Sequence, residues 1–238
     1  MTGIFVTGTD TDVGKTALTA LLLTEWRRRG IDAVPMKPAQ TGCAGDGVPD
    51  LDYALSLSGA SFPPDARALM APYRFEPACS PHLAAERAGT RIEISVILSA
   101  AERLAERHDR LVVEGAGGLL VPLNRRETML DLAKALRLPV VVVARPGLGT
   151  INHTLMTLEI LRSAEARIAG VVFVASTPDE PGFIERDNVE TIRKIGAVPI
   201  LGTIPNDPEL AQALPRLGRL TPAVVDAARV LADRLEAR

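Results

Sequence analysis

Near the start of the chain lies a short segment whose residue types suit the binding of phosphate. Residues 8–16 read Gly-Thr-Asp-Thr-Asp-Val-Gly-Lys-Thr, after a β-branched and aromatic run at 4–7 and before a helical pattern. Glycines let the backbone N–H groups of a loop point at phosphate oxygens, and the N-terminus of the next helix adds positive partial charge. In such a loop Lys15 reaches the β- and γ-phosphates, and the Thr16 hydroxyl holds Mg²⁺. The segment therefore predicts a nucleoside triphosphate site of the P-loop type.

The loop departs from the usual spacing at one position. The standard motif has a glycine with four residues between it and Gly-Lys-Thr, and Thr9 holds that position here, with Gly8 one residue earlier. A chance Gly-Lys-Thr in an ordinary strand–helix turn is the alternative. The strand before and the helix after are the context that the motif requires, so we interpret residues 8–16 as a variant P-loop.

Further side chains could act at the same site. Glu114 ends an apolar strand beside three glycines, where a carboxylate can bind Mg²⁺ directly or through water; a solvated loop glutamate is the alternative. Lys37 ends an earlier strand, where its ammonium could neutralise phosphoryl oxygens or simply lie at the surface. Asp52 could supply a second metal carboxylate, with Asp46 and Asp50 as competitors.

Strands and helices alternate along the chain, which predicts a parallel sheet with helices on both faces. Strands are expected at 4–7, 33–37, 111–113, 140–144, 168–174 and 199–204, and helices at 17–29, 52–57, from 81, 94–107, 128–136, 152–163, 185–195 and 222–235. Pro35 suggests an irregular or end position for its strand, the valines at 140–143 suit the sheet centre, and 59–80 is expected to be irregular. The predicted fold class is α/β, a doubly wound, mainly parallel sheet of the P-loop NTPase type with three layers.

Ligands bind such sheets at the carboxyl ends of the strands. The loops expected there are 8–16, 37–47, 114–118, 145–152, 174–182 and 205–210. The candidate residues of the P-loop, Lys37 and Glu114 are therefore expected to meet at one edge of the sheet.

Length and composition restrict the class of protein. With 238 residues, 47% of them hydrophobic and 24% charged, the chain suits one α/β domain over residues 1–238. A net charge of -2 gives no general attraction to nucleic acid or anionic lipid, and no apolar run approaches the ~20 residues that span a bilayer. The first residues lack the pattern of a signal peptide, and Cys43 and Cys79 have no metal-binding spacing. A cytoplasmic protein with reduced thiols, and with no nucleic-acid or membrane partner, is expected.

The motifs in combination resemble one enzyme family, the dethiobiotin synthetases. The matching segments, in order over residues 3 to about 215, are 5–16, 37–38, 80–82, 113–118, Leu123, 138–140 and 147–153. The resemblance implies a ligase of biotin biosynthesis that uses ATP and Mg²⁺. In that reaction 7,8-diaminononanoate takes up CO2 as a carbamate, ATP phosphorylates the carbamate, and the second amine closes the ring to give dethiobiotin, ADP and phosphate. Such chemistry needs charge neutralisation and alignment.

The resemblance also implies roles for individual residues. Carbamate and γ-phosphate oxygens would be held by the catalytic residues Thr11, Lys15 and Lys37. Mg²⁺ would be bound by Thr16, Asp52 and Glu114. ATP would be bound by Asp12, Val13, Gly14, Lys15, Thr16, Ala17, Glu114, Gly115, Ala116, Gly117, Pro205, Asn206 and Asp207. The substrate would be bound by Thr11, Lys37 and Thr41 and, across a homodimer interface, by the helix N-terminus at Gly149, Thr150, Ile151 and Asn152.

The expected adenine end departs from the family pattern. After the 168–173 strand the family often has an Asn-Asp pair whose asparagine reads the adenine edge, and here Val174, Ala175 and Ser176 follow. A valine side chain cannot make that donor–acceptor pair. The loop 205–207 fits the family in position but not in its usual hydrophobic residues. We therefore predict firm phosphate binding and weak discrimination among nucleoside triphosphates.

Two other P-loop classes are alternatives. A cobyrinate-synthase-like ATPase domain normally needs a glutaminase domain with a nucleophilic cysteine, for which we expect no room in 238 residues. A partition or division-site switch ATPase carries an extra lysine five residues before the P-loop lysine, and this chain has Asp10 there. Many such switches also need a basic tail, whereas residues 223–238 form an amphipathic pattern of mixed charge that favours packing on the domain.

Overall fold

The computed structural model describes residues 1–177 and 180–237, and within them the chain builds a six-stranded parallel sheet in the order β2-β5-β1-β6-β7-β8. Its strands are β1 (Gly3–Gly8), β2 (Ala33–Met36), β5 (Arg110–Glu114), β6 (Val140–Ala144), β7 (Ile168–Val174) and β8 (Ile200–Ile204). The central pair is β1 and β6, and the fully buried valines of β6 suit that place. Pro35 lies in the edge strand β2, where a missing N–H is tolerated. The predicted fold class is confirmed.

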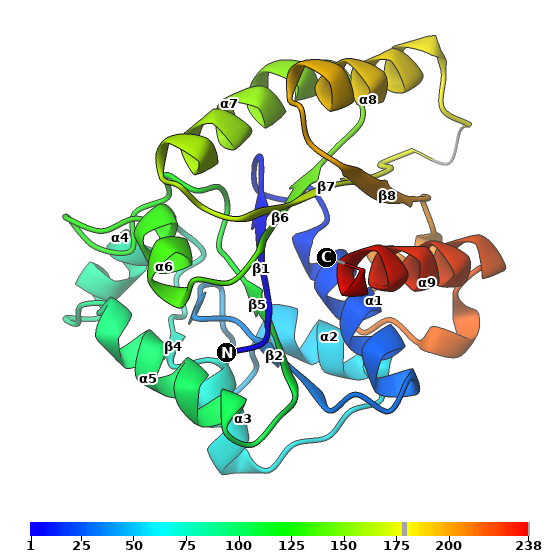
Figure 1. Ribbon diagram of the computed structural model, residues 1–238. Coiled ribbons are helices and arrows are strands. Elements are labelled where there is room, and N and C mark those ends of the chain that lie inside the picture. Colours follow the sequence, from blue (N-terminus) through cyan, green and yellow to red (C-terminus); the bar gives the residue numbers. More distant parts are fainter. Residues whose placement is uncertain (178–179, 238) are drawn as a thin grey trace.

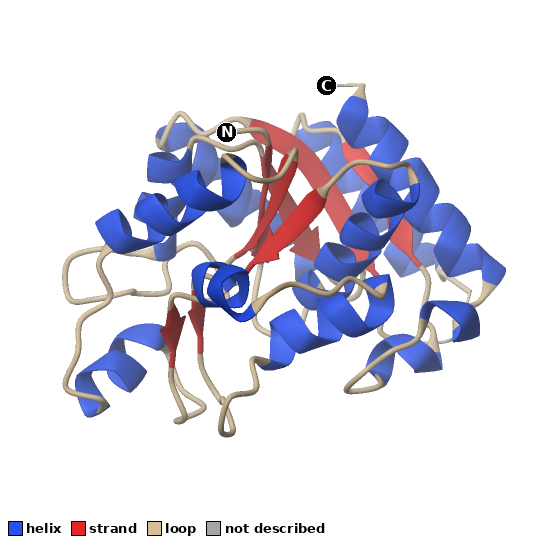
Figure 2. Cartoon of the chain, turned by 90° about the horizontal axis from the view of Figure 1, so that it is seen from below, coloured by secondary structure: helices blue, strands red, loops and turns tan. Residues whose placement is uncertain are grey.

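Helices cover both faces of the sheet, as Figures 1 and 2 show. They are α1 (Lys15–Arg28), α2 (Pro49–Ser58), α3 (Pro64–Met70), α4 (Pro81–Arg87), α5 (Ile94–Ala105), α6 (Met129–Leu136), α7 (Thr150–Ser163), α8 (Phe183–Ile195) and α9 (Pro222–Glu236). On one face α1 packs on β1, β2 and β5 and contacts α2 and α9, while α5 and α7 pack on β5 and β6. The sheet is therefore buried between two helical layers.

The strand register brings the predicted site residues to one level of the sheet. Val6 of β1 lies opposite Glu114 of β5, and Met36 of β2 lies opposite Val113. Lys37 therefore follows β2 at the height of Glu114, next to the point where β1 enters the P-loop. Parallel strands thus gather the three candidate segments at their carboxyl ends, as predicted.

Two local predictions differ from the structure by more than the one or two residues that separate the other predicted bounds from the observed ones. Residues 59–80 were expected to be irregular, but they contain α3 and the strand β4 (Tyr73–Arg74), which pairs with β3 (Ala39–Gln40) in a separate parallel sheet. Elements of two to seven residues are too short to leave a periodic pattern. Helix α2 begins at Pro49 rather than at residue 52, because proline is favoured in a first helical turn.

The remaining expectations concern the surface. In the described part of the chain no helix is long and apolar enough to cross a membrane. Helix α9 packs on α1 and β8 with Val224 and Leu231 buried, as the mixed-charge pattern predicted. Cys43 and Cys79 are free thiols. Of the predicted loop 174–182, residues 178–179 lie outside the described residues, as does residue 238 of the predicted C-terminal pattern.

Candidate active site

The P-loop joins β1 to α1 and lines a cavity of about 1060 Å³ at the carboxyl edge of the sheet. Gly14, directly before α1, has a φ of 99°, and a Cβ atom built on it would come within 2.7 Å of the Val174 side chain. Glycine is therefore required there both by the backbone conformation and by close packing. Asp12 also has a positive φ, 55°, which non-glycine residues adopt infrequently. These two residues bend the loop around the start of the helix, where an anion is favoured.

Lys15 is the first residue of α1 and is almost completely buried. Its ammonium donates a hydrogen bond to the Asp10 carbonyl oxygen at 2.7 Å, across the P-loop. Burial, followed by the positive charge of Lys37, lowers the pKa of Lys15 to about 8. A cation in this position is short of negative charge, so an anionic ligand would stabilise its protonated form.

The lowered pKa of Lys15 predicts that ATP affinity falls as the pH rises above about 8. Phosphate oxygens stabilise the protonated form of Lys15, so ATP binding raises the pKa of Lys15. When Lys15 of the free chain has lost its proton, ATP binding is therefore accompanied by uptake of a proton. Between the free and bound pKa values the dissociation constant should rise by up to about tenfold per pH unit. Calorimetric titrations between pH 7 and 10, in two buffers of different ionisation enthalpy, measure both the affinity and the proton uptake. Lys15→Arg, which stays protonated, is the control; affinity for the unaltered chain that is constant or rises with pH would contradict the assignment.

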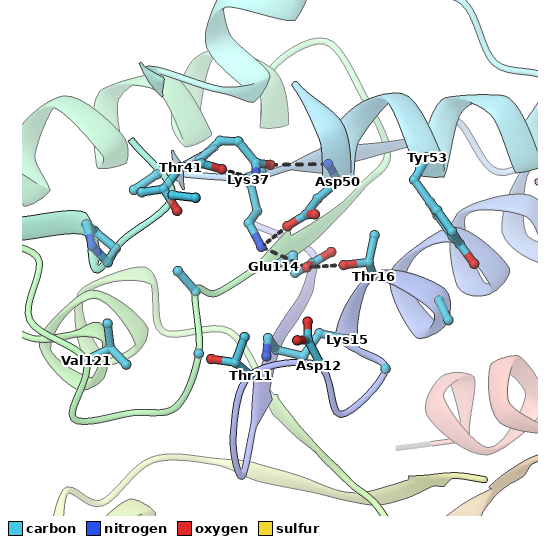
Figure 3. Close-up of a pocket in the computed structure, with 18 of the residues that line it drawn as sticks. Thr11, Asp12, Lys15, Thr16, Lys37, Thr41, Asp50, Tyr53, Glu114 and Val121 are labelled. Atoms are coloured by element: carbon cyan, nitrogen blue, oxygen red, sulfur yellow. Dashed lines mark hydrogen bonds and ion pairs between the residues drawn. The ribbon is translucent and has the colours of Figure 1, made fainter. Parts of the chain in front are cut away.

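Four side chains from four segments form a polar network on one wall of the cavity, of which Lys37 and Glu114 are buried (Figure 3). The Lys37 ammonium lies 2.8 Å from Glu114 Oε1 and 2.5 Å from Asp50 Oδ2. Glu114 Oε1 also accepts a hydrogen bond from the Thr16 hydroxyl at 2.8 Å. Lys37 and Glu114 are 5% and 2% exposed, so their charges meet with little water between them. Polar groups buried to this degree need each other as partners.

The charges in this network depend on one another. Burial opposes the charged form of Lys37, but the carboxylates of Glu114 and Asp50 outweigh that effect and raise its pKa. Burial raises the pKa of Glu114, while Lys37 and the Thr16 hydroxyl oppose that rise. Lys37 is therefore a firmly protonated cation shared by two carboxylates.

Asp52, predicted as a metal ligand, lies outside this network. Its carboxylate pairs with Arg67 at 2.5 Å and accepts the Val48 N–H at 2.8 Å, which ties the first turn of α2 to α3. Asp50 lines the cavity, and Asp52 is not among the described residues that do. Residues two apart on a helix point to nearly opposite sides, so only one of them can face the cavity. The prediction of Asp52 is corrected in favour of Asp50, which the sequence had left as a competitor.

The other predicted residues divide between the cavity and its surroundings. Those that line the cavity are Thr11, Asp12, Gly14, Lys15, Thr16, Ala17, Lys37, Thr41, Glu114, Ala116 and Gly117. Val13 is buried, and Gly115 lies where a Cβ would come within 3.2 Å of Phe5. Both residues therefore pack against the protein interior and support their loops without lining the cavity. The structure thus brings together most of the predicted phosphate and substrate residues.

Two predicted groups lie elsewhere. Pro205 and Asn206 line a separate hollow of about 460 Å³ beside α9, and the Asp207 carboxylate accepts bonds from the backbone of residues 209 and 221. Residues 149–152 form the start of α7 and are not among the described residues that line the cavity. Within one chain, neither group completes the site.

The structure also adds residues that were not predicted individually as site residues, although Gln40 and Leu210 lie in loops that were expected at this edge of the sheet. Gln40, Tyr53, Cys79, Ser80, Pro81, Val121, Leu210 and Ala211 line the cavity as well. Ser80 and Pro81 were predicted as a helix start and belong to the 80–82 segment that carried the family resemblance, but they had not been assigned to the site. Tyr53 belongs to no motif and to no loop expected at the site, and its contact with Leu210 is one that sequence spacing does not signal.

The donor groups of the network suit a nucleotide-bound Mg²⁺. Within the described residues no group of three or more His, Cys, Asp or Glu side chains forms a metal cluster. Mg²⁺ does not require one, because it usually takes one or two carboxylates and completes its shell with water and phosphate oxygens. Thr16, Asp50 and Glu114 are hard oxygen donors on a single wall, next to the phosphate loop. The residues present therefore fit the ion.

Comparison with known proteins shows which family the chain resembles. The model of a family described as an AAA domain matches residues 2–213. The chain is 42% identical over 225 residues to the ATP-dependent dethiobiotin synthetase BioD of Anaeromyxobacter dehalogenans strain 2CP-C, covering 94% of this chain and 99% of that protein. It is 38% identical to the BioD of Halalkalibacterium halodurans, covering 88% and 87% of the two chains.

Solved structures show the same fold at lower identity. The MinC:MinD cell division complex of Aquifex aeolicus matches with a TM-score of 0.66 and 19% identity, over 100% of this chain and 97% of that chain. A ParA family ATPase from Chlorobium tepidum matches with a TM-score of 0.60 and 16% identity, over 100% of both chains. These matches establish the P-loop NTPase fold, and the sequence relatives identify the branch within it. The chain belongs to the ATP-dependent dethiobiotin synthetase family.

Proposed function

We propose that this chain is an ATP-dependent dethiobiotin synthetase, which carboxylates 7,8-diaminononanoate with CO2 and closes the urea ring. The observation that carries the proposal is the position of Lys37, a buried cation between Glu114 and Asp50 beside the phosphate loop. A cavity of about 1060 Å³ also has room for a nucleotide's phosphates and a second small molecule. Family membership supplies the substrates.

Negative charge on the carbamate and phosphate oxygens changes during the reaction, and the cavity residues are suited to neutralising that charge. A carbamate oxygen forms a bond to the γ-phosphorus of ATP while the bond to the leaving ADP oxygen breaks. The second amine then attacks the carbamate carbon, phosphate leaves, and the nitrogen loses its proton. Lys15 and Lys37 would stabilise the anionic oxygens, and Thr11 and Thr41, which also line the cavity, would offer hydroxyl donors.

Metal binding would use the oxygens of the same network. Thr16, Asp50 and Glu114 would hold Mg²⁺, which would neutralise charge on the β- and γ-phosphates. Lys37 now shares the Asp50 and Glu114 oxygens at 2.5 and 2.8 Å, so it would exchange part of that contact for the anionic reactants.

A homodimer is part of the proposal because residues 149–152 do not line the cavity of their own chain. Leu148 is 86% exposed beside the N-terminus of α7, and Met156 on the same helix is 50% exposed. Apolar side chains exposed in this way suit coverage by a second copy, which would bring a helix N-terminus to the substrate carboxylate. Light scattering that gave a monomer at working concentration would contradict this part. A cytoplasmic location stays a prediction.

One incubation tests the proposed function. The chain is mixed with diaminononanoate, bicarbonate, Mg²⁺ and ATP, and dethiobiotin is sought by mass spectrometry together with ADP and phosphate. We expect product in a one-to-one ratio with ADP. Hydrolysis of ATP that is independent of the diamine, without product, would instead favour a switch-type ATPase.

Base selectivity is predicted to be weak. Val174 lies at the end of β7 against Gly14 and offers no hydrogen bond to a base edge. We expect kcat/KM for ATP, CTP and GTP to agree within about tenfold, because a site without polar contacts to a base rejects analogues poorly. Steady-state rates with each nucleotide measure this, and Val174→Asn should raise the preference for ATP. A preference of the unaltered chain for ATP above about 100-fold would contradict the prediction.

A further inference from the structure

We propose that Tyr53 is a positioning residue for the nucleoside end of ATP, an inference that rests on the proposed ATP-dependent function. Tyr53 is the one aromatic side chain among the described residues that line the cavity. Its hydroxyl donates a hydrogen bond to the Leu210 carbonyl oxygen at 2.8 Å. Leu210 and Ala211 line the same cavity, so this bond joins two parts of one wall.

The segment that Tyr53 holds has little regular structure of its own. Leu210 and Ala211 belong to the 3-10 turn Pro208–Ala211 between β8 and α9. Such turns have weaker hydrogen-bond geometry than α-helices, so contacts from outside determine where the turn lies. Tyr53 comes from α2, which packs firmly on α1, and it can therefore fix the turn to a rigid support.

The place of Tyr53 along the cavity indicates which part of the nucleotide it meets. Figure 3 shows Tyr53 beyond Thr16, on the side away from Thr41 and Val121. With its β- and γ-phosphates on the P-loop and the γ-phosphate toward Lys37, a nucleoside triphosphate extends its nucleoside in the opposite direction. That direction leads to Tyr53 and the 208–211 turn. Asp50 and Tyr53 are three residues apart on α2 and share a face, so one helix serves both ends of the nucleotide.

The hydroxyl is well suited to a constant structural bond. Burial, followed by the negative charges of Glu114, Asp207 and Glu209, raises the pKa of Tyr53. The hydroxyl therefore keeps its proton and remains a donor throughout the working range. Its role is to place a wall, and no step of the reaction needs it to ionise.

The chain contains a matched control for this bond. The Ser56 hydroxyl, on the same helix, donates to the Pro215 carbonyl oxygen at 3.0 Å, in the same connection between β8 and α9. Neither Ser56 nor Pro215 is among the described residues that line the cavity. Ser56→Ala therefore removes a comparable hydrogen bond between α2 and this connection without changing a residue that lines the cavity.

The experiment compares Tyr53→Phe, Ser56→Ala and the unaltered chain by calorimetry with Mg²⁺, using ATP and inorganic triphosphate as ligands. Triphosphate has the phosphates but no nucleoside. Tyr53→Phe should weaken ATP binding about fivefold, the effect typical of one neutral hydrogen bond, and leave triphosphate affinity and kcat at saturating ATP within about twofold. Ser56→Ala should leave both ligands unchanged, although its melting temperature falls.

Several results would overturn the inference. They are an equal loss of ATP and triphosphate affinity in Tyr53→Phe, a fall in its kcat, an unchanged ATP affinity, or the same ATP effect in Ser56→Ala. If the unaltered chain bound neither ligand and made no dethiobiotin, the proposed function itself would fail, and the inference with it.

Discussion

Lys37→Ala is expected to lower the turnover number by roughly 10²- to 10³-fold, the cost of removing a preorganised group that stabilises developing negative charge. Lys15 and the P-loop backbone remain in the variant, so the dissociation constant for ATP should change by less than about tenfold. Single-turnover rates at saturating ATP, together with calorimetric ATP titrations, separate the two quantities. Equal losses in turnover and in ATP affinity would contradict the assigned role.

The same substitution should also destabilise the fold. Lys37 is 5% exposed and neutralises Glu114 and Asp50, so alanine leaves two carboxylates facing each other in a buried site. Breaking a buried pair on one side costs about 3–5 kcal/mol of unfolding free energy. Lys194, 65% exposed and paired with Glu190 at 3.0 Å, gives the matched control, and Lys194→Ala should change stability by less than about 0.5 kcal/mol. Urea unfolding of both variants measures the difference, and circular dichroism verifies that the activity assay uses folded protein.

Strong local patterns allowed much of the fold to be predicted from the sequence. The bounds of β6 and β7 were predicted without error, since buried parallel strands are continuous β-branched runs bounded by loops. Lys37 and Glu114 were found because each follows an apolar strand, and strand ends of a parallel sheet converge. Their mutual ion pair depends on the strand order, which places β5 between β2 and β1. Chain order alone does not specify that arrangement.

The errors arose where the outcome depends on helix phase or on distant contacts. To choose between Asp50 and Asp52 as the residue that faces the cavity, the start of α2 must be known to within one residue. Two residues along a helix separate side chains that point to nearly opposite sides. Tyr53 meets a carbonyl 157 residues away, and no local pattern encodes that contact. The role predicted for residues 149–152 crosses a homodimer interface, so it stays a prediction that concerns a second copy of the chain.

Glu114→Gln is expected to raise the Mg²⁺ concentration for half-maximal activity at least tenfold and to lower turnover by about 10²-fold. The amide is nearly isosteric, and its oxygen can still accept from the Thr16 hydroxyl at 2.8 Å, so the cavity wall should keep its shape. Glu114 and Asp50 carry the two negative charges that face the phosphate loop, and the variant keeps only the charge of Asp50. Hard divalent cations depend on such charge far more than on a neutral carbonyl. Activity measured against Mg²⁺ concentration at fixed ATP tests the expectation.

A second buried glutamate distinguishes loss of metal affinity from general damage. Glu25 is 6% exposed, pairs with Arg28 and Arg29 at 3.0 Å, and is not among the described residues that line the cavity. Glu25→Gln should therefore lower stability and leave the Mg²⁺ dependence unchanged. Mn²⁺ binds the same kinds of oxygen ligand as Mg²⁺. We therefore expect Mn²⁺ to restore part of the activity of Glu114→Gln and to have no special effect on the activity of Glu25→Gln. The same shift in both variants, or unaltered Mg²⁺ dependence in Glu114→Gln, would remove Glu114 from the metal site and leave it only as the partner that holds Lys37 in place.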